Sequence, residues 1–293
     1  MRVTESLIYN QLNNDVNTST NNYTVLEQEL ATGKQINEPS DNPAGASQAM
    51  TIRALLVNIN QYQTDNSDAQ SYLQYSDSQL NSVETLVQQA RTIAVAAANG
   101  GTETADQQTA YSQQIQSIIG QLTTLANSEY NGQYIFSGQQ TGTAPYTAGD
   151  ATHTYNGDEG ALTATIGQNS TVQINTPGDQ IFQPQFAALE QLNTDIKAGN
   201  FTAISNTDLG SIDAGLSTIN NVRSGIGTSV DSLQSNATAL TNTQQNYQTS
   251  LASVEDANIA TVYTQLQVAQ NVYQASLVAT SKAVQYTLAQ YLQ

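Results

Sequence analysis

Few side chains in this sequence could perform catalysis or hold a metal ion. His153 is the only histidine, and the chain has no cysteine. A Ser-His-Asp triad would have to use His153, and a zinc site of the usual kind needs at least one more histidine or cysteine. Because His153 stands among turn residues, we expect an exposed residue at a strand edge.

The acidic and polar clusters also have simple structural interpretations. Asp150, Asp158 and Glu159 lack the spaced loop with a terminal Glu that binds calcium, so we expect ordinary turn acids. The run Ser40-Asp41-Asn42-Pro43 predicts a helix start, with Asn42 as the N-cap and Pro43 at the first helical position. No phosphate-binding glycine loop with a lysine occurs. We therefore expect no enzyme, no cofactor and no metal site.

The charge of the chain excludes further classes of partner. The formal net charge is −17, from 24 acids and seven scattered bases, so no basic surface for nucleic acid is expected. No segment has the ~20 consecutive apolar residues of a membrane span, so membrane insertion is not expected. The N-terminus lacks the apolar region of a cleaved signal peptide, which predicts that any export uses another route.

The two ends of the chain predict a pair of helices. Residues 1–32 and 228–293 contain no glycine or proline, and each carries apolar residues at steps of three and four. Neither apolar seam can be buried by its own helix, so the ends must meet each other or contact other chains. The residues expected at these inter-helix and subunit contacts are Leu12, Val16, Tyr23, Leu26, Leu30, Leu266, Val272, Leu277, Val284 and Leu288.

The segments between the ends predict further helices. Residues 44–99 and 105–131 are expected to form an antiparallel hairpin joined by Gly100-Gly101. Residues 185–198 and 208–224 follow, and the last helix is expected to start after Gly225 and Gly227. In the helix over residues 44–99, the apolar seam is predicted at Tyr62, Asn66, Ala69, Leu73, Ser76, Leu80, Val83, Val87, Ala90, Ala94 and Ala97.

Residues 132–184 have a different composition, with eight of the 18 glycines and three of the five prolines. Alternating apolar residues here predict four or five short strands. The fold class is therefore mainly α: an elongated rod of long helices with coiled-coil pairing of the terminal helices, plus a small β-rich insert. We expect three domains: residues 1–32 with 260–293, residues 33–131 with 185–259, and the insert 132–184.

The stretch Ala31-Thr-Gly-Lys-Gln-Ile-Asn-Glu-Pro-Ser-Asp-Asn-Pro43 and the residues up to Ala49 closely resemble the signature of the flagellin superfamily. A similar resemblance covers Arg91 to Gly100. Within the superfamily, Asn131 to Gly138 and the Tyr155-x-Gly-Asp-x-Gly160 stretch resemble the proteins of the hook–filament junction. The signature turn comprises Gly33, Asn37, Pro39, Asp41 and Pro43.

This resemblance implies a structural subunit of the bacterial flagellum. Such subunits form a homo-oligomeric ring that links hook-associated protein 1 to the flagellin filament. Their terminal helices form the inner layer, the middle helices the next layer, and the insert the outside. The resemblance also implies export through the flagellar type III apparatus, a cytosolic export chaperone at the C-terminal region, and an extracellular location without a cleaved signal peptide.

Three other interpretations remain open from the sequence. The chain could be flagellin itself, a surface adhesin that acts through residues 132–184, or a cytosolic coiled-coil scaffold. Isolated helices of low hydrophobicity are marginally stable in water. We therefore expect the terminal helices to be disordered in the free monomer and to fold on assembly, which proteolysis of the monomer would test.

Overall fold

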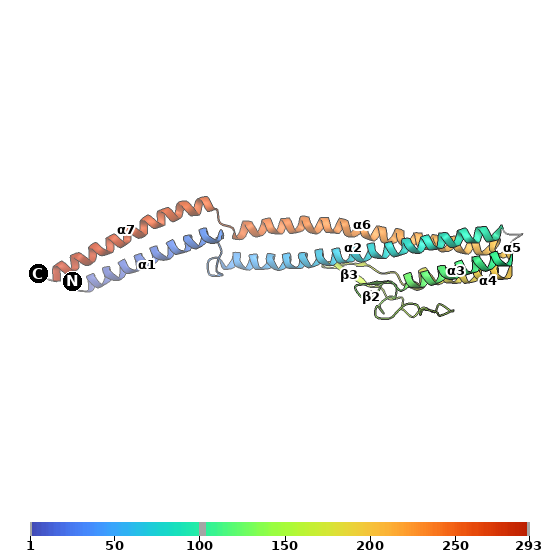
Figure 1. Cartoon of the computed structure of the whole chain (residues 1–293). Helices are drawn as coiled ribbons and strands as arrows, with labels where there is room; N and C mark the ends of the chain where they lie inside the picture. The colour runs from blue at the N-terminus through green and yellow to red at the C-terminus, as the bar shows by residue number, and fades with distance from the viewer. Residues whose placement is uncertain (1, 100–103, 292–293) are drawn as a thin grey trace. The chain divides into compact units, whose positions relative to one another are not determined.

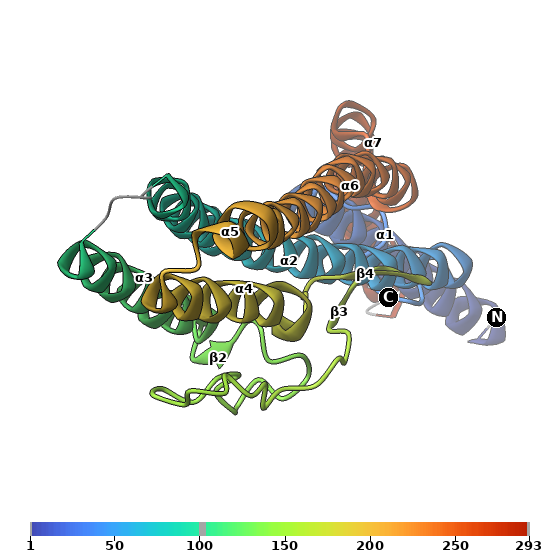
Figure 2. The same ribbon diagram turned by 90° about the vertical axis from the view of Figure 1, so that its right-hand side faces the viewer.

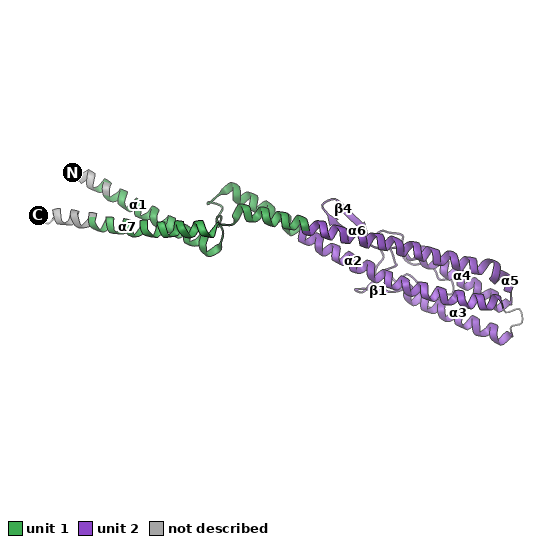
Figure 3. Cartoon of the chain, turned by 90° about the horizontal axis from the view of Figure 1, so that it is seen from above, with its two compact units in different colours: residues 1–58, 242–293 green, residues 59–241 purple. Residues whose placement is uncertain are grey.

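The computed structural model describes residues 2–99 and 104–291, which form two compact units (Figure 3). Unit 1 combines the N-terminal part up to Asn58 with the C-terminal part from Asn242. Unit 2 comprises Ile59–Thr241. Two long helices, α2 (Pro43–Ala98) and α6 (Leu209–Glu255), contribute a segment to each unit. The mainly helical class with a small β insert is confirmed.

Unit 1 contains the terminal helices α1 (Arg2–Thr32) and α7 (Ile259–Tyr291), which lie side by side and run antiparallel (Figure 1). The expected pairing of the two ends is confirmed. Helix α1 ends at Gly33, which has φ +72°. This left-handed conformation suits glycine because it has no Cβ, and the Gly33 N–H donates to the Glu29 carbonyl over 2.8 Å.

In unit 2, α2 packs with α3 (Ala105–Ala126), α4 (Gly178–Ala198) and α6. Figure 2 shows α3 and α4 lying side by side in this bundle. The predicted α2 seam is confirmed: all its residues are buried except Tyr62, which is half-buried. Thr104 and Gln107 cap the start of α3 reciprocally, so its first free N–H groups are satisfied.

Ion pairs join α2 to α6 inside unit 2. The Arg223 guanidinium donates to Asp77 over 2.9 Å and to Glu84 over 2.5 Å. Arg91 donates to Asp213 over 2.6 Å, with both side chains about half exposed. Because exposed pairs contribute little, the Arg223 network is the stronger connection, and burial of apolar side chains such as Leu80 and Leu233 dominates.

The insert forms two small antiparallel hairpins. One pairs β1 (Glu129–Tyr130) with β2 (Gln133–Tyr134), and the other pairs β3 (Thr163–Gly167) with β4 (Ser170–Gln173). The first turn is the pair Asn131-Gly132, both with positive φ, as a two-residue hairpin loop requires. The predicted helix over 105–131 is therefore too long: it ends at Ala126.

An aromatic core attaches the insert to α4. The rings of Phe136 and Phe182 lie 5.0 Å apart, and those of Tyr146 and Phe186 lie 5.1 Å apart. The Tyr146 hydroxyl donates to the Gly178 carbonyl over 3.1 Å. These contacts explain why α4 begins at Gly178 and contains Pro184, rather than beginning near Gln185 as predicted: the buried Phe182 holds the preceding turn in place.

The predicted start of the last helix after Gly225 and Gly227 is wrong. Helix α6 runs through both glycines, because Ile219, Ile226 and Leu233 are buried on its inner face and hold the backbone helical. The helix is interrupted instead between Glu255 and Ile259, a stretch that contains no glycine or proline. Helix α2 ends at Ala98, and the expected turn at Gly100-Gly101 lies outside the described residues.

A buried acid lies in the connection between α4 and α6 of unit 2. After α4, the chain forms α5 (Phe201–Ala203) and the π-helical turn η1 (Ile204–Asp208), which ends at Asp208, only 1% exposed. Burial, together with the charge of Asp195 and a hydrogen bond to it, raises the pKa of Asp208 to about 6. One oxygen of Asp208 has no hydrogen-bond partner. Keeping this group ionised at neutral pH therefore opposes folding.

We predict that D208N stabilises the protein at neutral pH. Because the pKa of Asp208 is about 6 in the folded protein and about 4 in the unfolded chain, the folded protein binds the proton more tightly. The free energy of unfolding therefore falls as pH rises from about 4 through 6. The gain in unfolding free energy should be about 1–2 kcal/mol at pH 7.5 and smaller at pH 4. Urea unfolding followed by circular dichroism measures it. The control D231N changes an exposed aspartate, and a gain as large in D231N would contradict the assignment.

Candidate functional site

The signature turn between α1 and α2 is a compact, self-capped loop. The Asp41 carboxylate accepts the backbone N–H groups of Asn37 over 2.9 Å and Glu38 over 2.8 Å, and these bonds lower the pKa of Asp41. The Asn42 side chain accepts the Gly45 N–H over 3.0 Å, which confirms its predicted role as the cap of α2. Pro43 is the first residue of that helix, where its missing N–H costs nothing.

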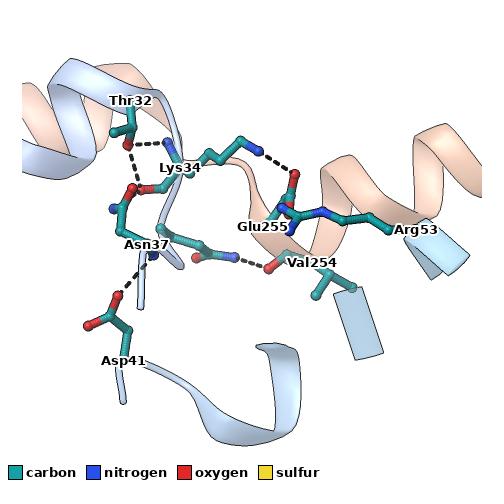
Figure 4. Close-up of polar contacts among 8 residues, drawn as sticks. Thr32, Lys34, Asn37, Asp41, Arg53, Val254 and Glu255 are labelled. Carbon is teal, nitrogen blue, oxygen red and sulfur yellow. Dashed lines mark hydrogen bonds and ion pairs between the residues drawn. The ribbon is translucent and has the colours of Figure 1, made fainter. Parts of the chain in front are cut away.

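An acid at the end of α6 holds this turn in place (Figure 4). The Glu255 side chain is only 6% exposed and accepts from the Lys34 ammonium over 2.8 Å and from the Arg53 guanidinium. We call Lys34, Arg53 and Glu255 the Glu255 cluster. It joins the turn and the adjacent helix α2 to the end of α6, which lies more than 200 residues further along the sequence.

Backbone hydrogen bonds reinforce the Glu255 cluster. The Gln35 N–H donates to the Glu255 carbonyl over 2.7 Å, and the Ala257 N–H donates to the Gly33 carbonyl over 2.9 Å. Lys34 and Asp256 form an isolated antiparallel bridge. The turn after α1 thus satisfies backbone groups that the α6–α7 break would otherwise leave unpaired. Helix α7 then begins after Asn258, whose side chain accepts the Thr261 N–H over 3.3 Å.

The electrostatics of Glu255 reflect two opposing effects. Burial alone would raise the pKa of Glu255, but the hydrogen bonds and charges of Lys34 and Arg53 outweigh burial and lower it. The cluster therefore stabilises unit 1 above the ordinary pKa of a glutamate and loses that effect as pH falls. Sequence reasoning missed this cluster. The signal available was that Lys34 and Arg53 are two of only seven bases.

All five residues predicted for α1 lie on the side that faces α7. Leu12, Val16, Tyr23, Leu26 and Leu30 are half-buried, and with the half-buried Ser19 they follow steps of four and three. The Tyr23 ring stacks on Tyr273 of α7, with ring centroids 6.1 Å apart.

Helix α7 departs from the predicted contacts. Leu266 is half-buried, but Val272 and Leu277 are 51% and 43% exposed. The buried side of α7 follows steps of four and three, and Val272 and Leu277 each lie one position away from it. The side chains of Val284 and Leu288 lie outside the described residues. The residues that form the seam, from fully to half-buried, are Val262, Leu266, Ala269, Tyr273, Ser276 and Thr280.

Large apolar side chains are exposed on both terminal helices. Three of them, Val25, Val268 and Val272, line an open groove of about 600 Å³ between α1 and α7. Tyr263 and Leu277 project from α7 elsewhere, 54% and 43% exposed. Single exposed apolar residues are normal, but a groove flanked by several marks a surface that binds another protein. We call the surface lined by these three valines the valine groove.

The residues first considered for chemistry have structural roles. His153 is buried rather than exposed, so that prediction is wrong: its ring stacks on Phe186 at 4.2 Å, and its backbone has φ +48°. Asp150 accepts from Thr152 and Thr154, and these hydrogen bonds lower its pKa to about 2. Within residues 2–99 and 104–291, no three acidic or histidine side chains gather as metal ligands.

The Asp158 side chain also belongs to a turn, since its carboxylate accepts the N–H groups of Gln139 over 2.6 Å and Gly160 over 2.9 Å. Glu159 is exposed. In the part of the chain that the structure describes, no helix combines the length and the apolar content needed to cross a bilayer.

Comparison with known families accounts for this arrangement. The model of the bacterial flagellin N-terminal helical region matches residues 3–141, and that of the C-terminal helical region matches residues 209–292. Together the two models cover more than half of the sequence. The chain belongs to the flagellin family, whose members are structural proteins of the flagellum and not enzymes.

Within that family the chain is similar to flagellar hook-associated protein 3. It is 33% identical to that protein of Salmonella typhimurium and 30% identical to that of Escherichia coli, each over 183 residues. The matched part is 62% of this chain and 57% of each relative. The chain thus spans somewhat more than half the length of these relatives.

A solved structure supports the fold. The crystal structure of flagellar hook-associated protein 3 from Legionella pneumophila matches with a TM-score of 0.66 over 70% of this chain and 98% of that chain. Sequence identity is 14%, so this similarity concerns the fold alone.

We predict that E255Q loosens the contact between the signature turn and the α6–α7 break. The Glu255 carboxylate is nearly buried and pairs with two half-exposed bases, so replacing it should lower the free energy of opening this contact by about 1–2 kcal/mol. Amide hydrogen exchange at Gln35 and Ala257 should accelerate roughly tenfold at pH 7.

The matched control is D256N, which removes one negative charge from the adjacent, exposed residue. Its exchange rates should stay close to those of the unmodified protein. The difference between E255Q and the unmodified protein should shrink as pH falls below the pKa of Glu255. Equal exchange in E255Q and D256N at pH 7 would show that the cluster does not hold the turn.

Proposed function

We propose that this protein is the adaptor of the hook–filament junction, which links hook-associated protein 1 to the flagellin filament and assembles as a ring. The observation that carries the proposal is the exposed apolar surface on the terminal helices, including the valine groove, in a chain similar to hook-associated protein 3. An apolar surface that the chain does not cover itself needs a partner.

The division of labour along the chain is part of the proposal. Residues 1–32 and 260–293 form an inner layer that contacts neighbouring subunits. Residues 33–131 and 185–259 form the next layer, and the insert 132–184 lies outermost. The Glu255 cluster stands at the boundary between the first two and orients the terminal pair.

The route to the flagellum is also proposed. The subunit leaves the cell through the flagellar type III apparatus without a cleaved signal peptide, and a cytosolic chaperone covers its C-terminal region before export. The α1–α7 seam suits this route because several of its positions are small or polar, so the isolated pair gains little from folding. The terminal helices then fold fully when neighbouring subunits cover them.

A second candidate is flagellin, the filament subunit itself. It is favoured by one observation: both matching family models describe regions of flagellin. The two candidates differ in polymerisation. Purified flagellin subunits extend long filaments from seeds, whereas a junction adaptor adds a bounded layer and stops.

Deletion of the gene in its source bacterium tests the proposal directly. We predict cells with hooks but no filaments and flagellin lost into the medium, as seen by electron microscopy and by immunoblotting of the supernatant. A plasmid copy of the gene should restore filaments. Hooks with no flagellin anywhere would identify the filament subunit instead, and unchanged filaments would refute both candidates.

A further inference from the structure

Four of the exposed apolar residues of α7 lie on two opposite faces of the helix. At about 100° per residue, positions nine apart lie about 180° apart around the axis. Tyr263 and Val272 are nine apart, and so are Val268 and Leu277. The valine groove therefore lies on one side of the terminal pair, and Tyr263 and Leu277 lie on the other.

The two faces have complementary character. The groove of about 600 Å³ is lined by short side chains, with Val25, Val268 and Val272 exposed by 46%, 62% and 51%. On the opposite face, the aromatic ring of Tyr263 projects with 54% of its surface exposed. Tyrosine is well suited to such a contact, because a large rigid ring buries much area while its hydroxyl stays hydrated.

Charge limits where two copies of this chain can meet, and the groove is a place where they can. Between residues 59 and 241 the chain carries sixteen acids and three bases, a net charge of −13, so most surfaces of two copies repel each other. All nine residues that line the groove are uncharged: Ser19, Asn22, Val25, Leu26, Thr264, Gln265, Val268, Ala269 and Val272. A contact between this groove and Tyr263 brings no acids together.

We propose that Tyr263 of one subunit docks into the valine groove of the next copy, with Leu277 extending the same contact. Two different faces then meet, which makes the interface heterologous. Such contacts generate closed rings or helical layers and never a closed two-fold dimer. This inference rests on the proposed function, because it names the partner of the terminal helices within the assembled ring.

Disulfide cross-linking tests the contact cleanly, because the chain has no native cysteine. In the double variant Y263C/V272C the two cysteines lie on opposite sides of one helix and about 14 Å apart along its axis. A disulfide needs Cβ atoms about 4 Å apart, so any bond between them joins two copies. The variant is expressed in cells that lack the native gene, and their flagella are oxidised mildly.

We expect a ladder of dimers, trimers and larger species on non-reducing gels probed for this chain, and only monomer for each single variant. The control Y263C/V278C uses an equally exposed valine, 53% against 51%, that lies outside the groove, and it should give no ladder. V268C replaces V272C in a second pair that probes the same groove.

Several results would overturn the inference. Dimers from Y263C or V272C alone would indicate a two-fold contact. A ladder from the control as strong as that from Y263C/V272C would show that the cross-link is not specific to the groove. The third result is that neither groove pair gives a ladder in flagella that contain the protein. Filament formation by the cysteine variants under reducing conditions shows whether the contact alone or the proposed function as well has failed. If the variants restore filaments to the deleted cells but give no ladder, the junction role stands and only the contact is wrong.

Discussion

An antiparallel pair of helices shares a single seam, and this constraint governs the terminal part of the chain. Between α1 and α7, the seam is filled partly by small residues such as Ala269 and Ser276, which lets the helices pack closely. Val268 and Val272 do not fall on the three-and-four spacing of the seam, so they are left outside it. Because the pair does not cover both of its flanks, we propose that its stability and its function both depend on neighbouring molecules.

The position of that pair depends on contacts far apart in the sequence. Helix α6 stops at Glu255 because the turn after α1 supplies partners for its last backbone groups, and because Lys34 and Arg53 neutralise the acid. The signature turn is thus more than a connection between two helices. It is one side of a contact that holds the end of α6 beside the end of α1.

The comparison of sequence and structure separates local from long-range causes. The α2 seam was predicted almost completely, since burial follows directly from the three-and-four spacing of residues such as Leu80 and Val87. The α6–α7 break was not predicted, because part of its cause is long-range: backbone hydrogen bonds join it to residues more than 200 positions away. Its local signal is Asn258, whose side chain accepts the Thr261 N–H at the start of α7. Val272 and Leu277 were predicted in the seam because they are apolar, but each lies one position away from the three-and-four spacing that the buried side of α7 follows.

The central claim is that the terminal helices gain their stability from neighbouring subunits. Hydrogen–deuterium exchange of residues 12–30 and 262–280, measured in the free monomer and in sheared flagella, tests it most directly. The account predicts rapid exchange in the monomer and slowing by at least about a hundredfold after assembly, while the bundle core of residues 80–97 changes little. Equal protection of the terminal helices in both states would contradict it.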